Sequence, residues 1–148
     1  MTLKEGDAAL IRSYARAAYP AECCGLLIGD TAADESCHIT AIVPSPNTAP
    51  DPTRHFAIDP QIQFDLMRSS RDTTTRRAGS VLDEFPRLRM VGHYHSHPNG
   101  RGEPSAEDAR MAYEQGVVWI IAAVAADVVS LRAFVPDASG FKEIPVRA

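Results

Sequence analysis

Three of the five histidines in this chain of 148 residues fall within one short segment. In an extended strand, residues two apart point to the same face, so His93, His95 and His97 would present their imidazoles side by side. The Gly- and Pro-containing loop that follows, Pro98–Pro104, could turn the chain back and bring Asp108 to the same place. Two imidazoles and one carboxylate suit a catalytic zinc ion, which keeps a fourth position open for water. The segment therefore predicts a zinc site that supports hydrolysis.

Each part of this pattern also has an ordinary structural explanation. Ser105 followed by Asp108 is typical of a helix N-cap with an acid at the third helical position. Two histidines separated by one residue on a strand are more often structural or solvent-facing than bound to a metal. The conjunction favours a metal site, because chance produces it in roughly one sequence in a thousand of this composition. The two roles of Ser105 are compatible, since a residue that caps the helix can also face the metal.

The complete pattern resembles the signature of the JAMM metalloproteases, the zinc-bearing MPN-domain family. The pattern consists of His95 and His97, then seven residues, then Ser105 and Asp108. The family also has a glutamate just before an apolar strand, and Glu22 fits that place. The resemblance implies one zinc ion held by His95, His97 and Asp108. It further implies that Glu22 is the general base for a zinc-activated water and that Ser105 steadies the developing oxyanion.

The resemblance also implies a fold and an activity. The fold would be the MPN fold of the α/β class, a mixed sheet packed between helices and similar in architecture to cytidine deaminases. The activity would be hydrolysis of a peptide or isopeptide bond at the C-terminus of a ubiquitin-like or sulfur-carrier protein that ends in Gly-Gly. Such a tail binds as an extended strand, so we expect a free sheet edge beside the zinc and a narrow slot for glycine. The loops Asn99–Gly102 and Ser69–Ser80 would form the walls of this slot.

Two other functions compete with this interpretation. A catalytically silent binding scaffold is the main alternative, because some members of the family have lost their ligands, whereas this chain retains all four catalytic elements. A zinc deaminase would share the fold, but its Cys-x-x-Cys and His-x-Glu motifs are absent from the sequence. Without the rest of the motif, Glu22 would be interpreted as a solvated residue after a helix. The sequence therefore favours a metallopeptidase.

Other chemically versatile residues receive structural interpretations. His93 lies at strand spacing from the proposed ligands, but the family more often has tryptophan there, so we expect it to pack or to form a hydrogen bond. Cys23 and Cys24 enter an apolar strand, where thiols are usually buried and inert. His38 and His55 have no metal-ligand spacing.

The elements that must position the site follow from apolar periodicity. Helices are predicted over Asp7–Tyr19, from Pro60 onward and over Ser105–Gln115. Strands are predicted at Cys23–Ile28, Ser36–Val43, His55–Ile58, Leu88–Tyr94, Val117–Ala125, Val128–Val135 and Phe141–Val146. A turn is predicted at Gly29-Asp30, and loops at Pro44–Thr53 and, mobile and polar, at Ser69–Ser80.

Length and composition indicate a single domain that spans residues 1–148. An apolar fraction of 45% and a charged fraction of 23% are near globular averages. The net charge of -4 lacks the basic field that nucleic acid binding requires. We expect no membrane span and no secretory signal, and three cysteines, two of them adjacent, make a poor disulfide framework. These features favour the cytoplasm and leave the oligomeric state open.

Overall fold

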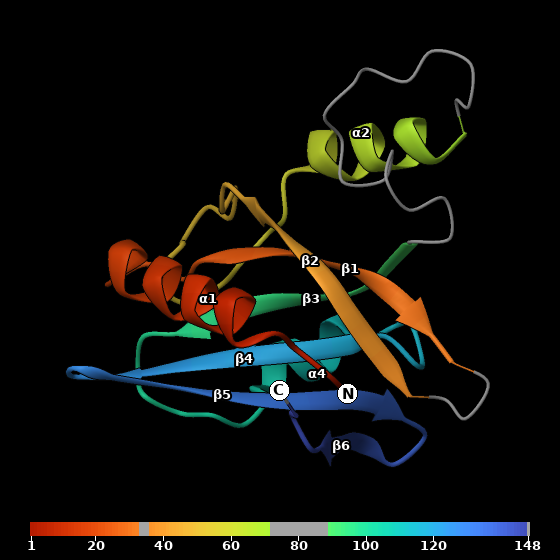
Figure 1. Ribbon diagram of the computed structural model, residues 1–148. Coiled ribbons are helices and arrows are strands. Elements are labelled where there is room, and N and C mark those ends of the chain that lie inside the picture. Colours follow the sequence, from red (N-terminus) through yellow and green to blue (C-terminus); the bar gives the residue numbers. More distant parts are fainter. Residues whose placement is uncertain (33–35, 72–88, 148) are drawn as a thin grey trace.

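The computed structural model describes residues 1–32, 36–71 and 89–147, which form a mixed sheet of six strands with helices on its two faces (Figure 1). The strand order is β2-β1-β3-β4-β5-β6. The helices are α1 (Glu5–Ala18), α2 (Pro60–Arg71) and α4 (Ala106–Met111). The strands are β1 (Cys24–Thr31), β2 (Cys37–Ser45), β3 (Arg89–His97), β4 (Val118–Ala125), β5 (Val128–Asp137) and β6 (Gly140–Ile144).

Strand β3 lies inside the sheet and is hydrogen-bonded on both sides. It pairs antiparallel with β1, where Cys24 lies opposite His95, and parallel with β4, where His97 lies opposite Ala123. The other neighbouring strands are antiparallel. The β3–β4 connection contains α4, as a crossover between parallel strands requires. Parallel and antiparallel pairs together confirm the mixed sheet that the sequence predicts.

Helix α1 covers one face of the sheet. Its buried residues Ala8, Ile11 and Ala15 recur at helical spacing and pack on the core that includes Leu27 and Ile120. This confirms the first predicted helix, which is followed by the cis peptide bond between Tyr19 and Pro20. Burial of an apolar stripe against the sheet, rather than helix propensity alone, stabilises such a helix.

The opposite face holds α2, α4 and two further apolar clusters. One cluster surrounds Trp119 and Phe56, with Met111 of α4 packed against it. The other contains Leu26, against which Ile62 of α2 packs. In Figure 1, α1 lies in front of the sheet and α4 behind it. The functional candidates lie on the α4 side of β3.

The N-terminal residues join the two ends of the sheet. Thr2 forms a parallel bridge with His38 of β2 and another with Arg147 near the C-terminus. The backbone N–H of Leu3 donates to the carbonyl oxygen of Arg147 at 2.8 Å. These bonds pair the β2 edge with the C-terminal segment, which reduces the unpaired backbone that an edge strand exposes.

Three sequence-based boundaries are wrong. Gly29 continues β1 instead of turning, because the approach of the His38 carbonyl oxygen leaves no room for a Cβ atom and suits glycine within a strand. The predicted strand at His55–Ile58 is reduced to a single bridge between Asn47 and Ile58. Helix α4 ends at Met111, four residues early, since Ala112 leaves helical geometry at φ -80°, ψ 62°.

The remaining predicted elements are confirmed apart from small shifts at their ends. The proposed mobile loop Ser69–Ser80 begins inside α2, which continues to Arg71, and its later part lies outside the described residues. No helix in the described ranges is both long and apolar enough to cross a membrane.

Candidate metal centre

Strand β3 presents its three histidines on one face, as strand alternation predicts. The ring centroids of His93 and His95 are 6.4 Å apart, and those of His95 and His97 are 4.8 Å apart. The intervening Tyr94 packs in the core on the α1 side. The imidazoles therefore form a row that runs toward the C-terminal end of β3.

The donor atoms of His95, His97 and Asp108 converge at one buried point. The two Nε2 atoms of the histidines are 2.9 Å apart. Asp108 places Oδ1 3.2 Å from His95 Nε2 and Oδ2 3.3 Å from His97 Nε2. Tetrahedral zinc with bonds of 2.0–2.1 Å separates its ligand atoms by about 3.3 Å. The type and the spacing of these donors thus fit a metal ion of this kind.

The electrostatics of the three groups agree with this fit. Burial lowers the pKa of His95, which keeps its imidazole neutral, as a metal ligand must be. Burial also disfavours charge on His97 and Asp108, but their mutual contact prevails, raising the pKa of His97 and holding that of Asp108 below its usual range. The ionised carboxylate therefore favours a positive charge at the point where the three groups meet.

Groups behind the donors orient them. His97 Nδ1 lies 2.9 Å from the backbone carbonyl oxygen of Arg101, to which it can donate, leaving the Nε2 lone pair for a metal. The ring of His95 stacks on Phe56 at 4.3 Å between centroids and an interplanar angle of 13°. Hydrogen bonding therefore orients one imidazole, and aromatic packing orients the other.

Helix α4 delivers Asp108 through a capping box. The backbone N–H of Asp108 donates to Ser105 Oγ at 3.1 Å, and the N–H of Ser105 donates to Asp108 Oδ2 at 2.6 Å. The predicted helix cap at Ser105 is thus confirmed. Ser105 Oγ accepts in the cap, the Ser105 side chain also helps to hold the pKa of Asp108 low by hydrogen bonding, and the residue is exposed to the cavity.

Glu22 lies between α1 and β1, with its side chain buried at 7% exposure. Its backbone N–H donates to the carbonyl oxygen of Pro52 at 2.7 Å, and its carbonyl oxygen accepts a hydrogen bond from Asn47 Nδ2 at 3.0 Å. Burial raises the pKa of Glu22 to about 7; His97 opposes this rise and Asp108 adds to it. A carboxylate with this pKa can exchange protons near neutral pH.

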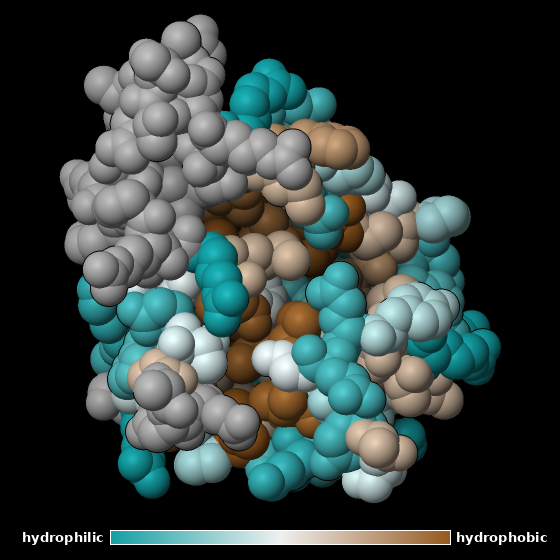
Figure 2. Space-filling model, turned by 90° about the vertical axis from the view of Figure 1, so that its right-hand side faces the viewer, coloured by the Kyte–Doolittle hydropathy of each residue, from teal (hydrophilic) through white to brown (hydrophobic). Residues whose placement is uncertain are grey.

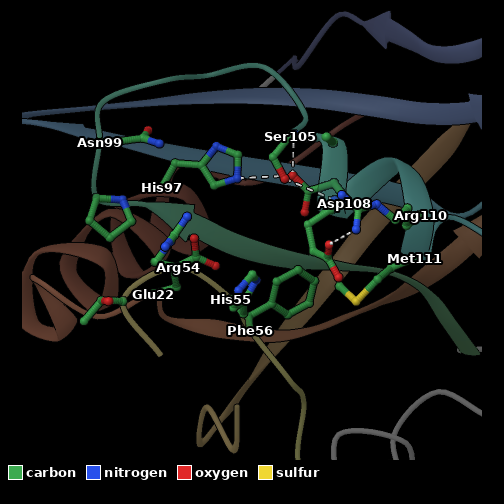
Figure 3. Close-up of a pocket in the computed structure, with 14 residues that line it drawn as sticks. Glu22, Arg54, His55, Phe56, His97, Asn99, Ser105, Asp108, Arg110 and Met111 are labelled. Carbon is green, nitrogen blue, oxygen red and sulfur yellow. Dashed lines mark hydrogen bonds and ion pairs between the residues drawn. The ribbon is translucent and has the colours of Figure 1, made fainter. Parts of the chain in front are cut away.

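Four of the five candidate residues line one cavity of about 500 Å³ (Figure 3). Glu22, His97, Ser105 and Asp108 all line it. His95 lies beneath, with no exposed surface. The structure therefore brings together every residue that the sequence assigned to the site, from three separate parts of the chain.

Sequence reasoning missed two residues that organise the site. Asn47 Oδ1 accepts hydrogen bonds from the backbone of Ala49 and Ala57, while its Nδ2 contacts Glu22. Phe56 supports His95, although its segment was predicted to be a strand. The Pro-Asn composition around Asn47 indicates a loop, but no sequence pattern shows which distant groups its side chain reaches.

The remaining candidates agree with their structural interpretations only in part, since Cys23 is half-buried and not buried as predicted. Cys24 is buried, and burial raises the pKa of its thiol to about 12, so it stays protonated at neutral pH. His38 lies on β2, where it contacts Thr2. Burial lowers the pKa of His93 to about 3, so this ring is neutral at neutral pH. His55 lines the cavity despite its uninformative spacing in the sequence.

Comparison with known families identifies the family of this chain. Residues 5–135 match the family described as prokaryotic homologs of the JAB domain. The chain belongs to this family. The match includes Glu22 and the segment with both histidines and Asp108, so the JAB domain contains all parts of the candidate metal centre. This confirms the resemblance to the JAMM family.

Individual relatives agree with the JAB assignment. A desampylase from Haloferax volcanii is 33% identical over 102 residues, which cover 69% of this chain and 62% of the relative. A solution structure of a protein from Desulfitobacterium hafniense has a TM-score of 0.78 and 26% identity, covering 99% of this chain and 90% of that one. A JAB1/MPN domain protein from Archaeoglobus fulgidus has a TM-score of 0.59 and 20% identity, covering 99% and 96%. These structural neighbours confirm the MPN fold.

Proposed function

We propose that this protein is a zinc-dependent metallopeptidase that cleaves a peptide or isopeptide bond after the C-terminal Gly-Gly of a ubiquitin-like or sulfur-carrier protein. One observation carries the proposal. The donor atoms of His95, His97 and Asp108 lie 2.9–3.3 Å apart at the wall of a cavity that Glu22 and Ser105 also line. The name desampylase of the relative supports a ubiquitin-like substrate.

The metal and Glu22 would divide the chemistry between them. A zinc ion held by His95, His97 and Asp108 would polarise the substrate carbonyl and lower the pKa of water to about 7. Glu22 would accept the proton of the attacking water and later give it to the leaving amine nitrogen. The burial that raises the pKa of Glu22 supports this role, because the proton can then be taken up and released near neutral pH.

Ser105 would stabilise charge on the substrate. When water attacks the carbonyl carbon, negative charge builds on the carbonyl oxygen. The Ser105 hydroxyl can donate a hydrogen bond to this oxygen while its oxygen continues to accept from the N–H of Asp108. The cap holds the hydroxyl at the cavity before substrate arrives, and such preorganisation is what makes a donor effective.

The direct test is cleavage of defined fusions. Zinc-loaded protein is incubated with ubiquitin-like and sulfur-carrier proteins that bear short extensions after Gly-Gly, and intact masses are measured. We expect a product that ends in Gly-Gly. Glu22→Gln is the matched control, which should retain zinc but lose about a thousandfold or more of the rate. A protein that binds no zinc and cleaves nothing would support the scaffold alternative.

We further propose that residues 1–148 form one domain and that the protein works in the cytoplasm. Cys23, Cys24 and Cys37 are free thiols, which suits a reducing compartment. Limited proteolysis tests the first proposal and cell fractionation the second.

A further inference from the structure

A second cavity, of about 290 Å³, adjoins the metal centre on the same side of the sheet. Its lining includes Met67 of α2, Met90 of β3 and Trp119 of β4. Met111 lines both this cavity and the one at the metal centre, so the two cavities are adjacent. The N-terminal end of β3 lies at the right of Figure 1, and Figure 2 shows hydrophobic side chains in a hollow on that side. We call this second cavity the apolar groove.

His93 is one of the polar residues that line the apolar groove, together with Gln63 and Glu114. Its Nε2 is buried and has no hydrogen-bond partner among the described residues. The ring is held by Trp119, with centroids 4.0 Å apart, and by Phe56 at 5.5 Å. An unsatisfied buried polar atom destabilises a fold, so such atoms are often retained where a ligand supplies the missing partner. A mostly apolar pocket with a few polar groups is typical of ligand sites.

The distance between His93 and His95 can be compared with the length of an extended substrate. Its ring centroid is 6.4 Å from that of His95, a proposed ligand. An extended chain advances about 3.3 Å per residue, so this separation corresponds to about two residues. The proposed Gly-Gly terminus would span it without side chains. The residues that precede Gly-Gly would then enter the apolar groove between Met67 and Met90.

The position of β3 in the sheet adds a constraint. Strand β3 itself offers no free edge beside the proposed zinc, because it is paired with both β1 and β4. A substrate tail that crosses β3 must therefore lie over the sheet face and take its polar contacts from side chains. His93 offers such a contact on this face.

We infer that His93 determines specificity: Nε2 hydrogen-bonds to the substrate backbone about two residues before the cleaved bond, and an apolar side chain further upstream fills the apolar groove. This inference rests on the proposed function. It commits to one occupant, the extended and apolar C-terminal tail of the ubiquitin-like protein. His93 acts by binding and takes no part in proton transfer.

The first test distinguishes the contribution of the His93 nitrogen to binding from the contribution of the ring. His93→Phe keeps an aromatic ring between Phe56 and Trp119 but removes the nitrogen, whereas His93→Gln restores a polar nitrogen. We expect His93→Phe to raise KM about tenfold with kcat little changed, because a contact made equally in the ground and transition states affects binding alone. His93→Gln should recover part of the loss, and zinc content and Tm confirm that both variants fold.

A binding measurement removes the dependence on turnover. Glu22→Gln protein is titrated calorimetrically with a synthetic tail peptide that ends in Gly-Gly, with and without His93→Phe. We expect about tenfold weaker binding in the double variant. A peptide in which an ester replaces the amide about two residues from its end should reduce this difference if that amide N–H is the bonded group. Unchanged KM and unchanged peptide affinity in His93→Phe would overturn the inference.

The apolar groove has its own matched pair of variants. Met90 is 41% exposed in the groove, and Leu10 is 45% exposed on α1, across the sheet. We expect Met90→Glu to raise KM about tenfold, because a carboxylate there disfavours an apolar side chain, and Leu10→Glu to have no effect. Equal effects of the two substitutions would refute the docking position.

Failure of the inference is distinguishable from failure of the proposed function. If zinc-loaded wild-type protein cleaves no fusion, the proposed function fails, and the peptide titration still reports on the groove. If wild-type protein cleaves the fusions and His93→Phe behaves like wild type, the inference about His93 alone fails.

Discussion

At the scale of single residues, Glu22 is buried at the wall of a solvent-accessible cavity. Burial makes its charged form costly, which is also what raises its pKa to about 7. The property that would let Glu22 exchange protons at neutral pH therefore destabilises the metal-free fold. Functional sites often reduce stability in this way.

We expect Glu22→Gln to stabilise the metal-free protein at pH 8 but hardly at pH 4. Because the pKa of Glu22 rises from 4.5 to about 7 on folding, the folded protein binds an additional proton between these values. The stability that this proton provides is present below pH 4.5 and is lost as the pH rises through 7. The corresponding difference is about 3 kcal/mol at pH 8. Urea unfolding with a chelator measures it, and equal effects at both pH values would contradict the shift.

Ser105 has two roles that one substitution can separate. Glycine at an N-cap costs only a few tenths of a kcal/mol relative to serine, whereas alanine costs about 1 kcal/mol. We therefore expect Ser105→Gly to keep its stability and zinc content but to lose about two to three decades in kcat, because the hydroxyl donor is gone. Thermal unfolding and steady-state kinetics on the same fusion measure both. A fully active Ser105→Gly would leave Ser105 with its capping role alone.

At the scale of elements, the loop between β2 and α2 connects the fold to the site. Asn47 makes four hydrogen bonds to backbone groups, two through Nδ2 to Glu22 and His55 and two through Oδ1 to Ala49 and Ala57. The loop then carries Phe56 to the ring of His95. One side chain thus fixes the main chain at both the proposed base and the support of a proposed ligand.

We expect Asn47→Ala to lower the free energy of unfolding by about 2–3 kcal/mol, because several backbone groups lose their partners. Activity should fall as well, since Glu22 and Phe56 lose a common anchor. Asp51→Ala is the matched control in the same loop, where the carboxylate accepts hydrogen bonds from Thr53 in an exposed turn. Urea unfolding of both variants tests this, and similar losses would show that the loop is generally sensitive.

At the scale of the whole molecule, the candidate metal centre joins segments that are far apart in the chain. His95 and His97 come from the central strand β3, and Asp108 comes from α4, with Glu22 facing the same cavity from the segment between α1 and β1. A metal ion there would link the sheet to the helix on its α4 face. Its binding energy would then contribute to the stability of the fold.

We expect metal removal to lower Tm in the wild-type protein. Zinc that binds only the folded state adds about 4 kcal/mol when its free concentration is a thousand times Kd. Asp108→Ala should lose most of this zinc-dependent rise, because it removes a ligand, whereas Asp137→Ala, an exposed aspartate on β5, should keep it. Thermal scans with zinc and with chelator measure the difference. A Tm that is insensitive to chelation would argue against the metal site.

The sequence by itself predicted the candidate donors, and part of the reason is local geometry. Residues two apart on a strand share a face, so short-range rules place His93, His95 and His97 side by side, and they also predict the helix cap formed by Ser105 and Asp108. The family pattern selected His95 and His97 from the three histidines. Helix α1 was equally predictable, because its apolar stripe recurs within one element. The family pattern supplied Glu22.

Only the tertiary structure decided what surrounds these donors. The contacts of Asn47 and Phe56, the raised pKa of Glu22 and the unpaired nitrogen of His93 all depend on segments that meet through long-range packing. The same holds for the early end of α4 and for the extended Gly29, where neighbouring strands override local turn preference. Burial and partnership are properties of the assembled fold, and single-sequence patterns do not contain them.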